Sequence, residues 1–345
     1  MYICLDTDVL LVRRGTSMFE PAVVVTGVAR HSLGEAFVRI YCGLMPEAQV
    51  IGIDQSANPE LRSLQTFSQV VFDLNPLRRP SGLKEFATDF SKTLAETVAA
   101  IGSEGIGCLV QCAGVYDFGR FIDHDASRRE RVLGLNVLGT TEVLHAVMSL
   151  NELRRIQNSE RFTNVLVSSF QGLHARADRP VYAPSKAYGI DLCTSLSAGQ
   201  EVAKCICVVP SSIDTPMLHR NHWVTKSGGS EDFFNKMLDG PRGRYCSIFV
   251  DGDEAALDEA ASEEPVGTTS GFRGIMRKYV AARLAAQSAP LGILSAEACA
   301  SALAEIVISS QSDSGVYVLT PASGATKAAV KKVPFSSLDR RGILM

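Results

Sequence analysis

The chain has 345 residues, with 34 Lys plus Arg against 37 Asp plus Glu, a formal net charge of -3 and 46% hydrophobic residues. This is the composition of an ordinary globular protein, and the balanced charge argues against a broad basic surface that would bind nucleic acid. The length allows two domains, or one large α/β domain with insertions.

Nine cysteines are scattered along the chain without a Cys-x-x-Cys pair, so neither a disulfide framework nor a zinc knuckle is predicted. His219 and His222 have a loop spacing that could hold a metal, but no third ligand is in view, and we expect no metal. Asp6 and Asp8 stand where a secretory signal needs a basic start, and no segment is expected to reach the length of a membrane span. We therefore expect a cytoplasmic protein with no membrane or nucleic-acid partner.

Short β-branched segments alternate with helix-length periodic segments over the first two thirds of the chain, as in a parallel sheet covered on both faces. The predicted strands are 22–26, 50–54, 70–73, 108–113, 164–169, 205–210 and 316–319. The predicted helices are 34–42, 83–100, 127–150, 182–199 and 296–309. Seven strands with helical crossovers predict a doubly wound (Rossmann) α/β fold, which binds ligands at the carboxyl ends of its strands.

The regular alternation stops after about residue 217. Residues 218–288 contain an acidic stretch followed by a basic one, most often a solvated helix pair, although a lid over a binding cleft also fits this place in the chain. We expect a single domain whose parts are an N-terminal extension (1–20), a nucleotide-binding and catalytic core (21–217), the insertion (218–288), the last helix and strand of the core (289–325) and a C-terminal tail (326–345).

The first predicted strand runs into a glycine turn, from Thr26 and Gly27 to Gly34, and then into a helix. Such a turn exposes the first amides and the positive end of the helix dipole, where a pyrophosphate binds, although it also occurs for purely structural reasons. Asp54 ends the second strand twenty residues after Gly34, where a carboxylate can accept hydrogen bonds from the adenosine ribose. Asp73, at the end of the third strand, would lie beside the adenine.

Two residues bear on the choice of cofactor. Asp54 favours NAD, because a carboxylate there repels the 2′-phosphate of NADP. Arg30 in the glycine turn favours NADP, because a guanidinium could pair with that phosphate, but it could equally be a solvated loop residue. The predicted cofactor is NAD, with NADP as the alternative.

The most informative residues are Ser169, Tyr182 and Lys186. Tyr182 and Lys186 are four apart and share one face of a helix, which must begin near Tyr182 because Pro184 is tolerated only in a first turn. A tyrosine is a poor base at neutral pH, but an ammonium about 4 Å away would stabilise the phenolate by about 4 kcal/mol and lower its pKa by about three units. The hydroxyl of Ser169 could hold a substrate oxygen while hydride moves.

With these residues in place, the sequence resembles the short-chain dehydrogenase/reductase superfamily, in its shorter single-domain branch and with an enlarged substrate loop. The resemblance implies that Tyr182 is the acid/base, that Lys186 lowers its pKa and binds the nicotinamide ribose, and that Ser169 orients the substrate oxygen. Asn136 looks like the family's helix asparagine that positions a water beside the lysine, although a buried asparagine bonded to helix backbone would have the same pattern.

The resemblance also implies a cofactor site and an assembly. The expected cofactor-binding residues are Thr26, Gly27, Arg30, Ser32, Leu33, Gly34, Asp54, Asp73, Leu74, Cys112, Ala113, Gly114, Tyr182, Lys186, Pro210, Ile213 and Thr215. A homodimer or homotetramer is expected through the helices at 127–150 and 182–199.

Three motifs depart from the family pattern. The glycine turn has one extra residue, and Ser32 replaces a middle glycine, so its hydroxyl could donate to the pyrophosphate or crowd it. Gln111 and Cys112 replace two asparagines, and Ser211 replaces a glycine.

We expect an oxidoreductase that interconverts a secondary alcohol and a ketone of a small-molecule substrate with NAD(H). One alternative is an NADPH-dependent biosynthetic ketoreductase in which Arg30 binds the phosphate. The other is a non-catalytic dinucleotide-binding sensor or scaffold of the same fold, against which the joint presence of Ser169, Tyr182 and Lys186 argues, because a pure binder has little need of an activated phenol.

Overall fold

The computed structural model describes residues 21–174, 177–239, 245, 249, 269–287, 292–309, 311–322 and 327–338. Its central sheet consists of β1 (Ala22–Thr26), β2 (Val50–Asp54), β3 (Phe67–Val71), β4 (Ile106–Gln111), β5 (Thr163–Val167), β6 (Lys204–Pro210), β9 (Gly315–Pro321) and β10 (Ala328–Val333). The eight strands have the order β10-β9-β6-β5-β4-β1-β2-β3, and only the β9-β10 pair is antiparallel.

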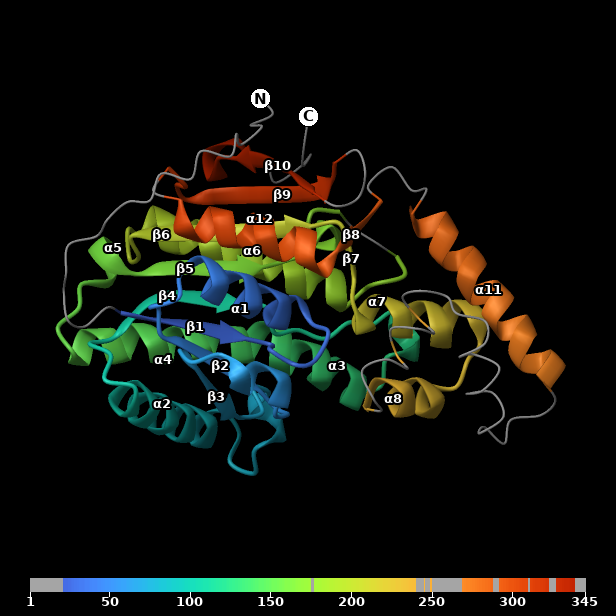
Figure 1. Cartoon of the computed structure of the whole chain (residues 1–345), viewed down its shortest axis with the longest axis horizontal. Coiled ribbons are helices and arrows are strands. Elements are labelled where there is room, and N and C mark those ends of the chain that lie inside the picture. The colour runs from blue at the N-terminus through green and yellow to red at the C-terminus, as the bar shows by residue number, and fades with distance from the viewer. Residues whose placement is uncertain are drawn as a thin grey trace.

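Helices cover both faces of this sheet (Figure 1). The helices α2 (Gly82–Ala100), α4 (Thr140–Leu153) and α6 (Tyr182–Ala198) contribute to the core on one face. The helices α1 (Leu33–Leu44) and α12 (Ala296–Ile308) contribute to the core on the other. The strands β1 and β2 are buried along their whole length, as expected for strands with helices on both sides. The predicted doubly wound α/β fold is confirmed.

The remaining elements lie around this three-layered core. They are β7 (Ser212–Asp214), β8 (Ile293–Ser295), α3 (Ala126–Leu133), α5 (Asn158–Arg161), α7 (Pro216–Arg220), α8 (Glu231–Asp239) and α11 (Thr269–Gln287). The prediction missed β7 and β8, which pair with each other in parallel, and β10, which makes part of the predicted tail 326–345 the edge of the sheet.

The strand order reverses between β1 and β4, which are neighbours in the sheet. Their register pairs Thr26 with Gln111, so the glycine turn after β1 lies beside the loop that follows β4. In a doubly wound sheet this point of reversal, at the carboxyl ends of the strands, forms the ligand-binding crevice.

One prediction about length was wrong. Residues Ala126–Leu153 form a continuous helical segment of 28 residues that is long and apolar enough to cross a membrane. In the fold, its residues Val143, Leu144 and Val147 are buried against the sheet instead. Packing in the core of the domain therefore accounts for its apolar character.

The described parts of the insertion 218–288 have a small core of their own, formed by Trp223, Phe233, Phe234, Met237, Tyr245, Phe249 and Tyr279. The insertion is nevertheless in contact with the glycine turn, because the ring of Tyr245 lies 4.9 Å from that of His31. The lid role stays a prediction, and the extension 1–20 lies outside the described residues.

Candidate active site

The glycine turn packs directly on the loop that follows β4. Gly27 has a φ of +76°, and a Cβ atom at this position would lie 2.6 Å from the amide nitrogen of Ala113. The hydroxyl of Thr26 accepts a hydrogen bond from the same amide at 3.2 Å. Only glycine satisfies both the backbone conformation and the close approach, which explains the Thr-Gly pair at the end of β1.

Ser32 caps α1, and its hydroxyl is used within the turn. Its Oγ donates to the carbonyl of Gly27 at 2.8 Å and accepts from the amide of Glu35 at 3.0 Å. The hydroxyl proton is therefore used within the turn, and the prediction that it could donate to the pyrophosphate is not supported. The amides of Leu33 and Gly34 in the first turn are left to bind an anion at the positive end of the helix.

Asp54 supports the turn from the end of β2. Its carboxylate accepts hydrogen bonds from the amide of Ala29 at 3.0 Å and from the amide and hydroxyl of Ser56 at 3.1 Å each. Burial raises the pKa of Asp54, and these hydrogen bonds lower it. Arg30 forms an ion pair with Glu60 at 3.1 Å, so its guanidinium is already neutralised within the chain.

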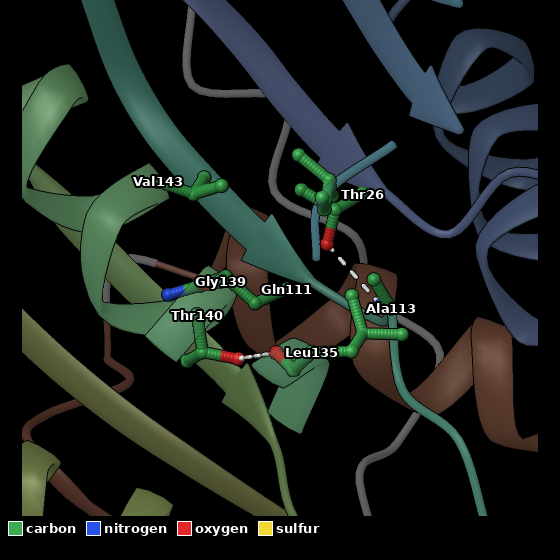
Figure 2. A pocket seen from close by; sticks show the side chains of 8 residues that line it. Thr26, Gln111, Ala113, Leu135, Gly139, Thr140 and Val143 are labelled. Atoms are coloured by element: carbon green, nitrogen blue, oxygen red, sulfur yellow. Dashed lines mark hydrogen bonds between the residues drawn. The ribbon is translucent and has the colours of Figure 1, made fainter. Parts of the chain in front are cut away.

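The residues expected near the adenine take two different environments. Asp73 forms an ion pair with Arg78 at 3.0 Å. Leu74 is buried and lines a small pocket with Thr26 and Ala113, opposite the helical residues around Gly139 (Figure 2). The space between these side chains has no room even for a water molecule, so it cannot hold a dinucleotide. Contact of Asp73 with the cofactor stays a prediction.

The catalytic residues predicted from the sequence meet at the start of α6. The helix begins at Tyr182, as the position of Pro184 predicts. The side chain of Ser169, two residues after the end of β5, lies near the hydroxyl of Tyr182 and lowers its pKa. The Nζ atom of Lys186 is buried and donates to the carbonyl of Val167 at 3.0 Å.

The electrostatics of this cluster differ from the prediction. Burial raises the pKa of Tyr182 to about 12, while the neighbouring Ser169 side chain and the charge of Arg179 lower it. Burial lowers the pKa of Lys186 to about 8, and the neighbouring side chains of Cys207 and Cys112 act in the opposite direction. The expected depression of the phenol's pKa by Lys186 is absent in the chain alone, because the ammonium is bonded to backbone and the phenol is desolvated.

Asn136 lies in a π-helical turn, Gly134–Gly139, between α3 and α4. Such a wide turn is common at functional sites. The side chain bonds both backbone groups of Val115, at 2.8 and 2.9 Å, and donates to the hydroxyl of Ser185 at 3.0 Å. It therefore ties the loop after β4 to the catalytic helix rather than bonding to its own helix backbone.

Gly114 shows how closely these groups approach. A Cβ atom on this residue would lie 3.2 Å from Nζ of Lys186 and 3.3 Å from Oδ1 of Asn136. Because Gly114 has no side chain, the loop after β4, which includes Cys112 and Ala113, can pass close to the lysine. Contact of the cofactor ribose with Lys186 stays a prediction.

On the other side of the crevice lies the segment that follows β6. Pro210 ends β6, Ile213 lies within β7, and Thr215 precedes α7. Ser211 is buried, and its hydroxyl has no hydrogen-bond partner among the described residues. A buried polar group without a partner points to a missing ligand, so this segment fits a bound dinucleotide.

The family follows from the match of the sequence as a whole. The family model described as short chain dehydrogenase matches residues 22–223. The chain belongs to the short-chain dehydrogenase family. The match covers residues 22–217 of the predicted core and the first residues of the insertion, and it ends before the predicted last helix and strand at 289–325.

Solved structures resemble this short-chain dehydrogenase at low sequence identity. Ligand-free aldohexose dehydrogenase of Thermoplasma acidophilum is 18% identical, with a TM-score of 0.52, over 84% of this chain and 88% of that one. A short chain dehydrogenase family protein of Francisella tularensis is 17% identical, with a TM-score of 0.52, over 85% and 92%. A 4-hydroxyisoleucine dehydrogenase complexed with NADH is 15% identical, with a TM-score of 0.51, over 86% and 96%. These likenesses concern the fold.

Two residues beside Tyr182, the predicted acid/base of this short-chain dehydrogenase, were missed. The ring of Tyr116 lies 4.8 Å from that of Tyr182 in an edge-to-face contact, and the guanidinium of Arg179 lies 5.1 Å from the Tyr116 ring centroid. Their sequence signals are weak, since Tyr116 follows Gly114 by two residues and Arg179 precedes Tyr182 by three. Only the fold brings the two segments together.

In the described part of the chain, no three His, Cys, Asp or Glu side chains are grouped as metal ligands. His219 instead lies within 2.7 Å of the carboxylate of Asp214, and its ring also bonds to the hydroxyl of Tyr279. These contacts account for a buried histidine by interactions within the chain.

Proposed function

We propose that this protein is an NAD(H)-dependent oxidoreductase that interconverts a secondary alcohol and a ketone. The observation that carries the proposal is the cluster at the start of α6, where Ser169 lies near the phenol of Tyr182 and the buried ammonium of Lys186 lies one turn away. A dinucleotide-binding scaffold would have no need of a buried phenol with a serine hydroxyl beside it. The bound nicotinamide would accept or supply the hydride.

Each residue then has a defined task in moving the proton. Ser169 holds the substrate oxygen next to the Tyr182 hydroxyl, and Tyr182 removes the alcohol proton or returns it to the ketone. Lys186 supplies a positive charge beside the loop after β4, next to Gly114. Asn136 positions the loop after β4 against the catalytic helix through Val115 and Ser185.

Turnover of secondary alcohols with NAD⁺, followed by the absorbance of the reduced nicotinamide, tests the proposal. Because burial raises the pKa of Tyr182 to about 12, little phenolate is present at pH 7. Alcohol oxidation needs the phenolate, so its kcat/KM should rise with pH, by close to ten-fold per unit between about pH 6 and 7.5, and less steeply above about pH 8, where Lys186 loses its proton. Ketone reduction needs the protonated phenol and should show no such rise. A plateau of the oxidation rate reached below pH 8 contradicts a raised pKa.

NAD is the proposed cofactor, rather than NADP, for two reasons. Asp54 brings a carboxylate to the end of β2, and Arg30 is paired with Glu60. The similar 4-hydroxyisoleucine dehydrogenase has NADH bound, which agrees with this choice. The NADPH ketoreductase remains the second candidate because a doubly charged 2′-phosphate could draw Arg30 away from the half-buried Glu60.

Binding of the two reduced cofactors should distinguish these candidates. We expect NADH to bind at least about ten-fold more tightly than NADPH, because a like charge faces the 2′-phosphate. Glu60→Gln should release Arg30 and tighten NADPH binding several-fold without changing the dissociation constant for NADH. Glu47→Gln, at an exposed site, is the matched control. An unchanged ratio in Glu60→Gln would mean that Arg30 does not face the phosphate.

The assembly through 127–150 and 182–199 and the cytoplasmic location stay predictions.

A further inference from the structure

The catalytic phenol has a polar wall on one side that the proposed reaction does not use. This wall consists of Tyr116 and Arg179. The guanidinium of Arg179 lies over the ring of Tyr116, and the ring of Tyr116 meets that of Tyr182 edge to face. The loop after β4 supplies Tyr116, and the segment before α6 supplies Arg179. The ring of Tyr116 therefore lies between the positive charge of Arg179 and the ring of Tyr182.

Both side chains have donors that lack an acceptor. The side chain of Arg179 is only 12% exposed, and Nη1 donates to Asp178. Its Nε atom and the hydroxyl of Tyr116 are buried; the Arg179 side chain lies close enough to Tyr116 to lower its pKa, but in the part of the chain that the structure describes neither atom has a hydrogen-bond partner within normal distance. A buried donor without an acceptor costs about 1–3 kcal/mol, so two such donors beside one phenol indicate a ligand that supplies oxygen atoms.

The charge balance limits what this ligand can be. Asp178 neutralises Arg179 through an ion pair, but its side chain is 47% exposed, so solvent weakens the pair. The pair occupies one end of the guanidinium and leaves the Nε edge for a second acceptor. One positive charge that is already shared suits a singly charged, planar anion better than a doubly charged phosphate, and a carboxylate matches the guanidinium fork.

We propose that Arg179 and Tyr116 form a subsite that binds a carboxylate of the substrate, one methylene away from the carbon that reacts. The substrates would then be hydroxy acids and the corresponding oxo acids. This inference rests on the proposed function and deepens it, because it names the substrate class of the same site. Arg179 would act in specificity, through binding, while Tyr182 acts on the reacting oxygen.

Kinetics on matched substrates give the first test. With NAD⁺, the wild type should oxidise a 3-hydroxycarboxylate with a kcat/KM about 10- to 100-fold above that of its methyl ester, the range expected for hydrogen bonds to a charged group. Arg179→Gln should remove this preference, mainly by raising KM for the acid; the loss of its charge beside Tyr182 should change kcat for acid and ester by the same factor. Arg62→Gln, on an exposed helical turn after β2, is the matched control and should retain the preference.

A binding measurement separates failure of the subsite from failure of the proposed function. Binding of 3-hydroxybutyrate to the full chain with saturating NADH, with which an alcohol cannot react, can be followed by ligand-observed NMR. We expect the dissociation constant to rise at least about ten-fold in Arg179→Gln and less in Tyr116→Phe, which keeps the ring and removes one neutral donor. This result supports the subsite whether or not the protein oxidises an alcohol. If the acid binds in this way but no alcohol is oxidised, only the proposed function is contradicted.

Three outcomes overturn the carboxylate subsite. They are the absence of binding to the wild type, equal binding to wild type and Arg179→Gln, and equal turnover of acid and ester by the wild type. Should Arg179→Gln fail to fold, Tyr116→Phe decides, because an unchanged dissociation constant in that variant excludes the hydroxyl from the subsite.

Discussion

Replacing Tyr182 by phenylalanine should lower kcat for alcohol oxidation by about 100- to 10,000-fold and leave the dissociation constant of NADH nearly unchanged. The phenyl ring preserves the edge-to-face contact with Tyr116 at 4.8 Å and fills the same buried space. Only the hydroxyl near the Ser169 side chain is lost. Initial rates with a secondary alcohol and a titration of NADH measure the two quantities.

Tyr188→Phe is the matched control for this variant, because it removes a hydroxyl from the same helix away from the site. Its hydroxyl bonds to Thr141 at 2.7 Å, so the loss should appear in stability, by about 1 kcal/mol, and not in turnover. Unchanged turnover in Tyr182→Phe would refute the proposed reaction and favour the dinucleotide-binding scaffold.

Lys186→Met should lower kcat/KM by at least about 100-fold, because it removes the positive charge beside the crevice and the donor expected for the nicotinamide ribose. Unlike Tyr182→Phe, it should also weaken the binding of NADH. Methionine keeps most of the side chain's volume, so packing at the start of α6 is retained. Lys84→Met, at an exposed position of α2, should change neither quantity.

Lys186→Met should also be more stable than the wild type at pH 7. Burial lowers the pKa of Lys186 to about 8, below its ordinary 10.5, so the folded state binds this proton less tightly than the unfolded state. Folding then carries a cost that is full below pH 8, shrinks as the pH rises and is gone above about 10.5. Methionine removes the cost, which is at most about 3 kcal/mol. Chemical unfolding at pH 7 and at pH 10 measures the difference, and a loss of stability at pH 7 would contradict a buried ammonium.

Most of the fold could be predicted because its signals are local. The alternation of apolar β-branched runs with periodic helices gave the exact bounds of β1 and β2 and the start of α6. The missed strands have weak local signals. β7 and β8 have three residues each and exist through a pairing of Ser212 with Ile293, and β10 carries Lys331 and Lys332 on the exposed edge of the sheet.

In the candidate site, the sequence by itself determined the types of reacting groups. The four-residue spacing of Tyr182 and Lys186 and the position of Ser169 after a strand are enough to predict that they meet, because helix and strand geometry depend on neighbours along the chain. The sequence also located the glycine turn of Gly27, which its backbone conformation requires.

Only the tertiary structure decided the charge state and the partners of these groups. Burial raises the pKa of Tyr182, which Lys186 was expected to lower. Glu60 forms an ion pair with Arg30, and Ser32 donates its hydroxyl within its own turn. The wall formed by Tyr116 and Arg179 joins two segments far apart in the sequence. Desolvation and Coulomb energies depend on every neighbour in space, so no local pattern can determine them.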